Sequence, residues 1–168
     1  MNILFNTFLF ITSFVLMECT AWFMHKYVMH GFGWFLHKSH HTPQKGKFEL
    51  NDLYPFIFAA PAFFLMFYGV KNLDWRFWVG SGMTFYGICY FIFHDIIVHR
   101  RFGHKIMLRN KYFQKITRAH KIHHKNLGSK DAEAFGFLFS AKDYISAKTE
   151  QKSINLKVVS KSDMHLSE

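Results

Sequence analysis

Ten histidines follow a pattern that occurs twice in this chain of 168 residues. Each occurrence has two histidines five positions apart, H-x4-H, and then a run of three, H-x2-H-H. Neutral imidazole is a nitrogen ligand suited to iron, zinc, copper or nickel. Ten imidazoles exceed what one metal ion can use, so the pattern predicts two metal ions. The expected ligands are His25, His30, His37, His40, His41, His94, His99, His120, His123 and His124.

The donor set excludes several kinds of metal site. Few carboxylates accompany the histidines, whereas Ca²⁺ and Mg²⁺ require oxygen ligands. The set also differs from that of soluble di-iron helix bundles, in which glutamate predominates. The other two histidines, His104 and His165, lie outside the pattern, and we expect them to be ordinary polar residues.

The spacing within each motif restricts how a helix presents it. Positions i, i+3 and i+4 share one face of an α-helix because successive residues turn by about 100°. All three imidazoles of an H-x2-H-H run can therefore point the same way. Positions i and i+5 differ by about 140°, so an H-x4-H pair does not share a face of a straight helix. Either the pair straddles its site from a helix end, or the helix is locally distorted there.

Three apolar runs accompany the histidine motifs: residues 3–24 precede the first set, and residues 53–70 and 77–93 lie between the two sets. At about 1.5 Å per residue, such runs have the length needed to cross a hydrocarbon layer of about 30 Å. The first run lacks the basic start and small-residue cleavage site of a signal peptide. A fourth, shorter membrane-associated helix in the region 104–140 stays open.

The expected fold is therefore all-α. It is an integral membrane helical protein with three or four spans and a histidine-rich helical cap that holds two metals. We expect one membrane-embedded domain over residues 1–147 and a polar, flexible tail over residues 148–168.

Lysine and arginine are distributed unevenly, which predicts the orientation. Residues 99–168 hold 15 of the 21, residues 25–52 hold four, the turn at 71–76 holds two, and residues 1–24 hold none. By the positive-inside rule, the N-terminus lies outside and both histidine-rich segments lie in the cytoplasm. Attraction to anionic lipid headgroups accounts for the net charge of +10, so no nucleic-acid partner is expected.

Four acidic residues are candidates for contacts with the histidines. A metal-bound histidine usually donates its second ring N–H to a neighbouring acceptor, which fixes its tautomer. Asp95, Glu49, Asp52 and Glu133 are the candidate acceptors, and solvation at a helix end or surface is the alternative for each.

Other charged residues have simpler expectations. Glu18 lies in the first apolar run, where an unpaired charge is costly. It either makes a functional contact or is a protonated or hydrogen-bonded core residue. Arg100, Arg101 and Lys121 are expected to lie on solvated basic faces.

The blocks around the histidines extend the pattern beyond metal ligation. Together they resemble the bacterial β-carotene hydroxylases of the membrane fatty acid hydroxylase superfamily, from about Met17 to Tyr144. The histidine spacing alone indicates only the wider superfamily of hydroxylases, desaturases and ketolases, and the intervening blocks make the resemblance more specific. The blocks are H-K-Y-V-M-H-G-F-G-W at 25–34, H-K-S-H-H at 37–41, F-E-L-N-D-L-Y at 48–54, F-H-D at 93–95, V-H at 98–99, A-H-K-I-H-H at 119–124 and F-G-F-L-F at 135–139.

The resemblance implies a non-haem di-iron oxygenase in the bacterial cytoplasmic membrane. Its iron ions, held by the ten patterned histidines, use O₂ and two electrons to hydroxylate the β-ionone rings of a carotenoid, converting β-carotene to β-cryptoxanthin and then to zeaxanthin. In that family electrons come from a separate redox protein, usually ferredoxin with its reductase. This chain has neither a dinucleotide-binding fingerprint nor a cysteine cluster motif to replace them, so the resemblance implies such a partner. Phe135, Phe137 and Leu138 are candidate contacts for the carotenoid, with interfacial packing as the alternative.

Two other functions are weighed against this one. The first is a sterol or fatty acyl hydroxylase or desaturase, which uses a similar ligand set on another lipid. The second is a membrane metal transporter. A transporter places polar ligands near the bilayer midplane, whereas these histidines lie at the ends of apolar runs, which disfavours transport.

Overall fold

The computed structural model describes residues 2–42, 46, 48–103 and 108–140. Every regular element within these ranges is helical, which confirms the all-α prediction. The elements are α1 (Ile3–Phe23), η1 (Met24–Phe32), α2 (Trp34–His41), η2 (Leu50–Asp52), α3 (Leu53–Gly69), α4 (Trp75–Tyr90), η3 (Phe91–Val98) and α5 (Lys111–His123).

Three of the described helical segments are long and apolar enough to cross a membrane: Ile3–Phe32, Leu50–Gly69 and Trp75–Val98. They extend the three apolar runs predicted from sequence. The fourth helix left open in the region 104–140 is α5, which has 13 residues. At about 1.5 Å per residue it is about 20 Å long, too short to span a hydrocarbon layer of about 30 Å.

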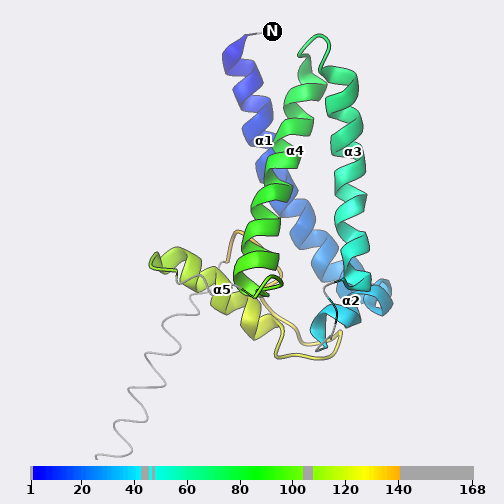
Figure 1. Ribbon diagram of the computed structural model, residues 1–168, viewed down its shortest axis with the longest axis vertical. Coiled ribbons are helices and arrows are strands. Elements are labelled where there is room, and N and C mark those ends of the chain that lie inside the picture. Colours follow the sequence, from blue (N-terminus) through cyan, green and yellow to red (C-terminus); the bar gives the residue numbers. More distant parts are fainter. Residues whose placement is uncertain (1, 43–45, 47, 104–107, 141–168) are drawn as a thin grey trace, which may run out of the picture.

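The long helices run side by side, and α4 packs against both α1 and α3 (Figure 1). Two glycines of α4 make these approaches close. A Cβ on Gly80 would lie 2.8 Å from the Ala62 carbonyl oxygen of α3, and one on Gly82 would lie 2.4 Å from the Phe10 carbonyl oxygen of α1. A Cβ on Gly87, the third glycine of α4, would meet no atom within 4 Å.

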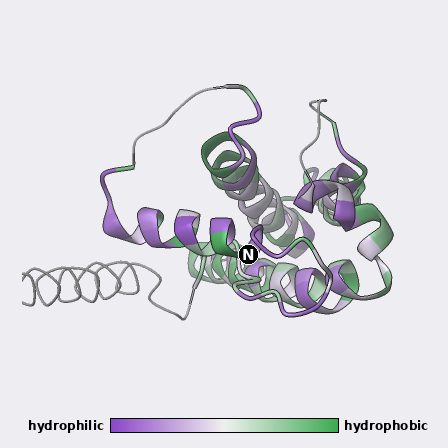
Figure 2. Cartoon of the chain, turned by 90° about the horizontal axis from the view of Figure 1, so that it is seen from below, coloured by the Kyte–Doolittle hydropathy of each residue, from purple (hydrophilic) through white to green (hydrophobic). Residues whose placement is uncertain are grey.

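The two ends of the bundle differ in composition. The N-terminus and the turn between α3 and α4 lie at one end, while α2 and α5 gather at the other (Figure 1). Large apolar side chains such as Phe8, Phe63 and Phe67 face outward, as expected for helices that face lipid. Figure 2 views the second end, where the largely hydrophilic α5 lies across the axes of the long helices. The histidine-rich cap sits at this end.

Some sequence-based predictions fall outside the described residues. These are the tail over 148–168 and the two unpatterned histidines, His104 and His165.

Candidate metal centre

The ten patterned histidines come together in two groups of five. Within each group the candidate ligand nitrogens all lie within 4.8 Å of one another. We name the groups after two histidines of α2. The His37 cluster comprises His25, His30, His37, His41 and His123; the His40 cluster comprises His40, His94, His99, His120 and His124.

Each cluster takes one histidine from the other half of the chain. His40 leaves the first set of motifs and joins the four histidines of the second, while His123 crosses in the opposite direction. Both are the middle histidine of an H-x2-H-H run, at position i+3. Neither cluster is therefore complete without both halves of the repeat.

The H-x4-H pairs lie on π-helical turns, which is the local distortion that sequence analysis left open as one alternative. η1 continues α1 and carries His25 and His30, while η3 continues α4 and leads from His94 to His99. The His99 amide donates to the His94 carbonyl oxygen five residues earlier, at 2.9 Å. Because this i→i+5 bond places residues five apart one above the other, both imidazoles of a pair reach one site.

In the His37 cluster every ring turns its Nδ1 outward to a neutral oxygen. His37 donates to the Asn51 side-chain oxygen at 2.7 Å. The other four donate to backbone carbonyl oxygens at 2.8–3.1 Å. These carbonyls belong to Phe135 for His25, Ser129 for His30, Asn126 for His41 and Glu133 for His123.

In the His40 cluster two rings make outward contacts to carboxylates. His40 Nδ1 lies 2.9 Å from Glu49 Oε2, and His94 Nδ1 lies 3.3 Å from Asp95 Oδ2. Arg101 joins these groups: its Nε is 2.8 Å from Asp95 Oδ1 and its Nη2 is 3.8 Å from Glu49 Oε1. The charge next to this cluster is thus organised as a network.

Arg101 corrects one expectation from sequence. Its side chain is only 15% exposed and pairs also with Asp52, at 2.6 Å, so it does not lie on a solvated face. The turn after η3 brings Arg101 back onto the carboxylates, because its amide donates to the Asp95 carbonyl oxygen. A basic residue two positions after a histidine gave no indication of this in the sequence.

The inward nitrogens fit a cation. Facing Nε2 atoms are 3.2 Å apart for His25 and His37 and 3.0 Å apart for His40 and His94. Each of these rings has its N–H on Nδ1, where the partner is an acceptor, so two lone pairs face each other. A metal ion relieves this repulsion. Nitrogens about 2.1 Å from a shared metal and at right angles lie about 3.0 Å apart.

Burial keeps the imidazoles in the neutral form that ligates metals. It lowers the pKa of His37 and of His123 to about 3, with smaller contributions from neighbouring histidines. Burial likewise lowers the pKa of His124 to about 2 and that of His99 to about 4. A neutral ring offers a lone pair without first losing a proton.

The four acidic candidates occupy different places. Glu49 and Asp95 contact histidine rings directly. Asp52 contacts Arg101 and accepts a hydrogen bond from the Glu49 amide at 2.9 Å, one step further from the rings. Glu133 reaches His123 through its backbone carbonyl oxygen, a contact that its side-chain type does not determine.

Glu18 is a hydrogen-bonded residue that fastens the segment after α5. Its Oε1 accepts from the backbone amides of Phe137, Leu138 and Phe139, each at 3.0 Å. Its Oε2 accepts from the Tyr86 hydroxyl at 2.8 Å. A carboxylate in span one thereby holds the chain against α1 and α4.

The fastened segment lies against both clusters. The Phe137 ring stacks on His25 of the His37 cluster, with centroids 5.0 Å apart, and lies 5.6 Å from His94 of the His40 cluster. Phe135 contacts His25 at 5.5 Å. Leu138 packs on the apolar core beside Phe137. The late apolar patch therefore forms a wall over the histidines.

Sequence reasoning missed Asn51 and the backbone acceptors. Asn51 is 2% exposed and supports His37. It lies within the block at 48–54, where an amide side chain close to two carboxylates was the signal that the sequence offered. Carbonyl oxygens carry no sequence signal, because every residue has one.

Comparisons with known proteins agree with this arrangement. A family model described as fatty acid hydroxylase matches residues 10–147. The chain is 42% identical over 139 residues to a β-carotene hydroxylase of Pseudescherichia vulneris, covering 83% of this chain and 79% of that protein. It is 40% identical over 137 residues to one of Pantoea ananas, with coverage of 82% and 78%. No solved structure gives a significant match.

Proposed function

We propose that this chain, which belongs to the fatty acid hydroxylase family, hydroxylates the β-ionone rings of carotenoids. The reaction places a hydroxyl group at the 3-position of each ring, so β-carotene becomes β-cryptoxanthin and then zeaxanthin. Each step consumes one O₂, two electrons and two protons, and yields one C–OH group and one water. Two relatives named β-carotene hydroxylase, of which the matches cover 79% and 78%, support this substrate.

The observation that carries the proposal is the convergence of ten imidazole nitrogens into two groups of five. Each group would hold one iron ion. Bound iron would supply the activation of O₂, which an aliphatic C–H bond requires because no side-chain base removes its proton. The outward Nδ1 contacts hold seven of the ten rings in the orientation and tautomer that ligation needs.

The remaining residues bind and orient a hydrocarbon. A small cavity of about 10 Å³ lies beside His94 and His120, lined also by Tyr90, Phe93 and Phe137. Its lining is largely aromatic and aliphatic, and the void is too small to admit a β-ionone ring while Phe137 stays in this position. Because Phe137 closes this cavity, we infer that its displacement admits the ring, and that Glu18 determines how far the segment moves.

The orientation and electron supply belong to the same proposal. The lysine and arginine distribution favours placing the histidine cap on the cytoplasmic side of a bacterial membrane. There a ferredoxin, kept reduced by its reductase, would deliver two electrons for each hydroxylation.

Expression in a β-carotene-producing bacterium, followed by pigment chromatography, tests the proposal. We expect β-cryptoxanthin and zeaxanthin to form, and about two iron ions to be retained per purified chain. Unchanged β-carotene together with a modified sterol or acyl lipid would contradict the substrate. Active protein without transition metal would contradict the mechanism.

A further inference from the structure

A groove separate from the histidine clusters lies between η3 and α5. Its volume is about 460 Å³. Ile97 and Arg100 contribute from the η3 side, and Thr117 and Lys121 contribute from α5, with Leu108 just before that helix. None of the ten patterned histidines lines the groove, so its chemistry is independent of metal ligation.

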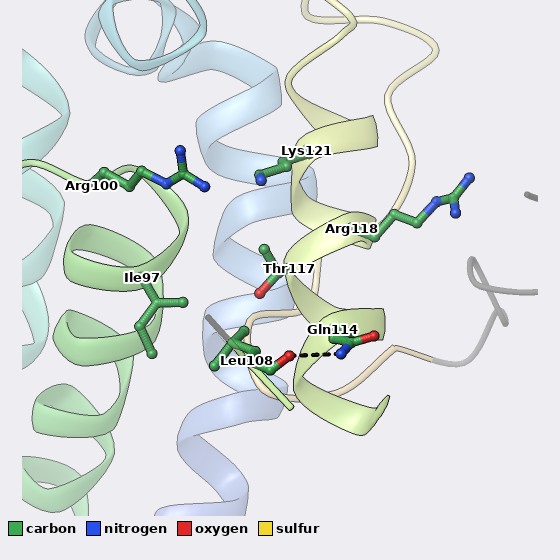
Figure 3. Close-up of a pocket in the computed structure, with 7 residues that line it drawn as sticks. All are labelled: Ile97, Arg100, Leu108, Gln114, Thr117, Arg118 and Lys121. Carbon is green, nitrogen blue, oxygen red and sulfur yellow. Dashed lines mark hydrogen bonds between the residues drawn. The ribbon is translucent and has the colours of Figure 1, made fainter. Parts of the chain in front are cut away.

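The groove changes from apolar to cationic along its length. Figure 3 shows Leu108 and Ile97 towards one end and the side chains of Arg100 and Lys121 at the other. Thr117 lies between them, and Arg118 also lines the groove, with its guanidinium directed away from the gap in this view. Among the described residues, those that line the groove include no acidic side chain. An amphiphile with a negative head therefore matches the lining from end to end.

The backbone turns Arg100 and Arg101 to different surroundings. Arg101 is occupied by the carboxylates of the His40 cluster, whereas Arg100 lines the groove. Arg100 adopts a left-handed conformation, with φ of 54°. Such a conformation is uncommon for a residue other than glycine and is concentrated at ligand-binding sites.

Thr117 gives an independent indication of a ligand. Its Oγ1 is buried and has no hydrogen-bond partner within the described part of the chain. Threonine in a helix commonly bonds a carbonyl oxygen one turn earlier, as Thr20 does with Leu16 at 2.8 Å. Because a buried hydroxyl without a partner is costly, the groove favours a ligand that offers an acceptor at this position.

The position of the groove identifies the kind of ligand. Arg100 lies two residues beyond the end of the span Trp75–Val98, at the level where a bilayer has its headgroups. We propose that the groove binds one anionic phospholipid. Its phosphate lies between Arg100 and Lys121, a glycerol ester oxygen accepts from Thr117, and the start of an acyl chain lies on Ile97 and Leu108.

Lipid retention by the full-length, iron-loaded protein tests this assignment. The protein is placed in nanodiscs of phosphatidylcholine with a minor fraction of phosphatidylglycerol, and the phospholipids retained after extraction are counted by native mass spectrometry. We expect the wild type to retain one phosphatidylglycerol. Arg100→Gln with Lys121→Gln should reduce that retention by about tenfold or more, because each basic group near the surface contributes to binding of anionic lipid.

A matched variant separates a site from general charge. Lys111→Gln with Lys115→Gln removes the same charge beside the groove, and should retain phosphatidylglycerol as the wild type does. Thr117→Val keeps all charges and should lower retention several-fold, a readout that survives if the double variant fails to fold.

Three results would overturn the assignment. The first is equal loss of phosphatidylglycerol from the two double variants. The second is displacement of the lipid by inorganic phosphate at equal concentration, because the apolar end would then contribute nothing. The third is retention of phosphatidylcholine as strong as that of phosphatidylglycerol.

Discussion

The His37 and His40 clusters repeat the same motifs but rest on different supports. Four rings of the His37 cluster donate to backbone carbonyls, and the fifth donates to an amide. Two rings of the His40 cluster face carboxylates, and Arg101 balances that charge. A carboxylate partner makes an imidazole more basic than a neutral partner does. A repeated ligand pattern thus encodes two unequal candidate metal sites.

Replacing His40 or His123, each of which joins the cluster of the other half of the chain, tests the difference between the clusters most severely. We expect His40→Ala and His123→Ala each to abolish turnover, while membrane insertion is unaffected. His40→Ala should lower iron retention at the His40 cluster and His123→Ala at the His37 cluster, by more than the about 10–100-fold that losing an outer partner costs. Spectroscopy of the remaining iron distinguishes the two variants.

Lys115→Ala, on the same helix as His123, is the control for expression and folding. Zeaxanthin formation at the wild-type rate in either histidine variant would remove that residue from the ligand set.

Removing one acceptor of an outward Nδ1 hydrogen bond from each cluster compares how strongly these acceptors support metal binding. Asn51→Ala deprives His37 of its neutral acceptor, and Glu49→Ala deprives His40 of its charged one. We expect Glu49→Ala to weaken metal binding by about 10–100-fold and Asn51→Ala to weaken it less. Competition with a chelator, followed by iron analysis, measures both affinities.

Glu49→Gln sharpens this result because it keeps an acceptor and removes only the charge. Its affinity should fall between that of Glu49→Ala and that of the wild type. Equal losses for Glu49→Ala and Asn51→Ala would mean that charge does not distinguish the clusters.

Removing Arg101 should destabilise the protein through the His40 side alone. Arg101→Gln leaves the carboxylates of Asp52, Asp95 and Glu49 without their counter-charge. We expect the free energy of unfolding to fall by about 2 kcal/mol, less than for a fully buried pair because the network is partly exposed. Thermal unfolding in detergent measures the change. Arg100→Gln removes the same charge at the preceding residue and should leave the unfolding temperature nearly unchanged.

The smallest effect on function is expected for variants that loosen the apolar wall lying over both clusters. Glu18→Gln retains a single side-chain acceptor for the amides of Phe137, Leu138 and Phe139. We expect the KM for β-carotene to rise about threefold to tenfold, since one or two charge-assisted hydrogen bonds are lost. Iron content should not change.

Tyr86→Phe removes one donor to Glu18 and should have a smaller effect on KM. Loss of iron from Glu18→Gln would mean that this contact supports the clusters rather than the wall.

The fold and the gathering of histidines follow from local features of the sequence. Apolar runs of sufficient length predicted three spans, and the helical spacing of H-x2-H-H predicted a shared face. The assignment of each ring to a cluster did not follow. His40 and His41 are adjacent in sequence, yet the 100° turn between them sends them to different clusters.

The outer contacts could not be predicted for a different reason, because they depend on long-range packing. His25 meets the Phe135 carbonyl oxygen, 110 residues later, only after the segment behind α5 folds back. No local pattern distinguishes that carbonyl from any other. The π-helical turns were the intermediate case: the H-x4-H spacing required either a helix end or a distortion, and the structure has the distortion.

The exchange of His40 and His123 governs when the centre can be assembled during synthesis. The first hundred residues insert all three spans yet supply only four nitrogens to one cluster and three to the other. A nascent chain in the membrane therefore has no complete five-nitrogen site until α5 emerges and docks. Under the proposed function, iron binding at either complete cluster would follow the docking of α5, together with the placement of the aromatic wall.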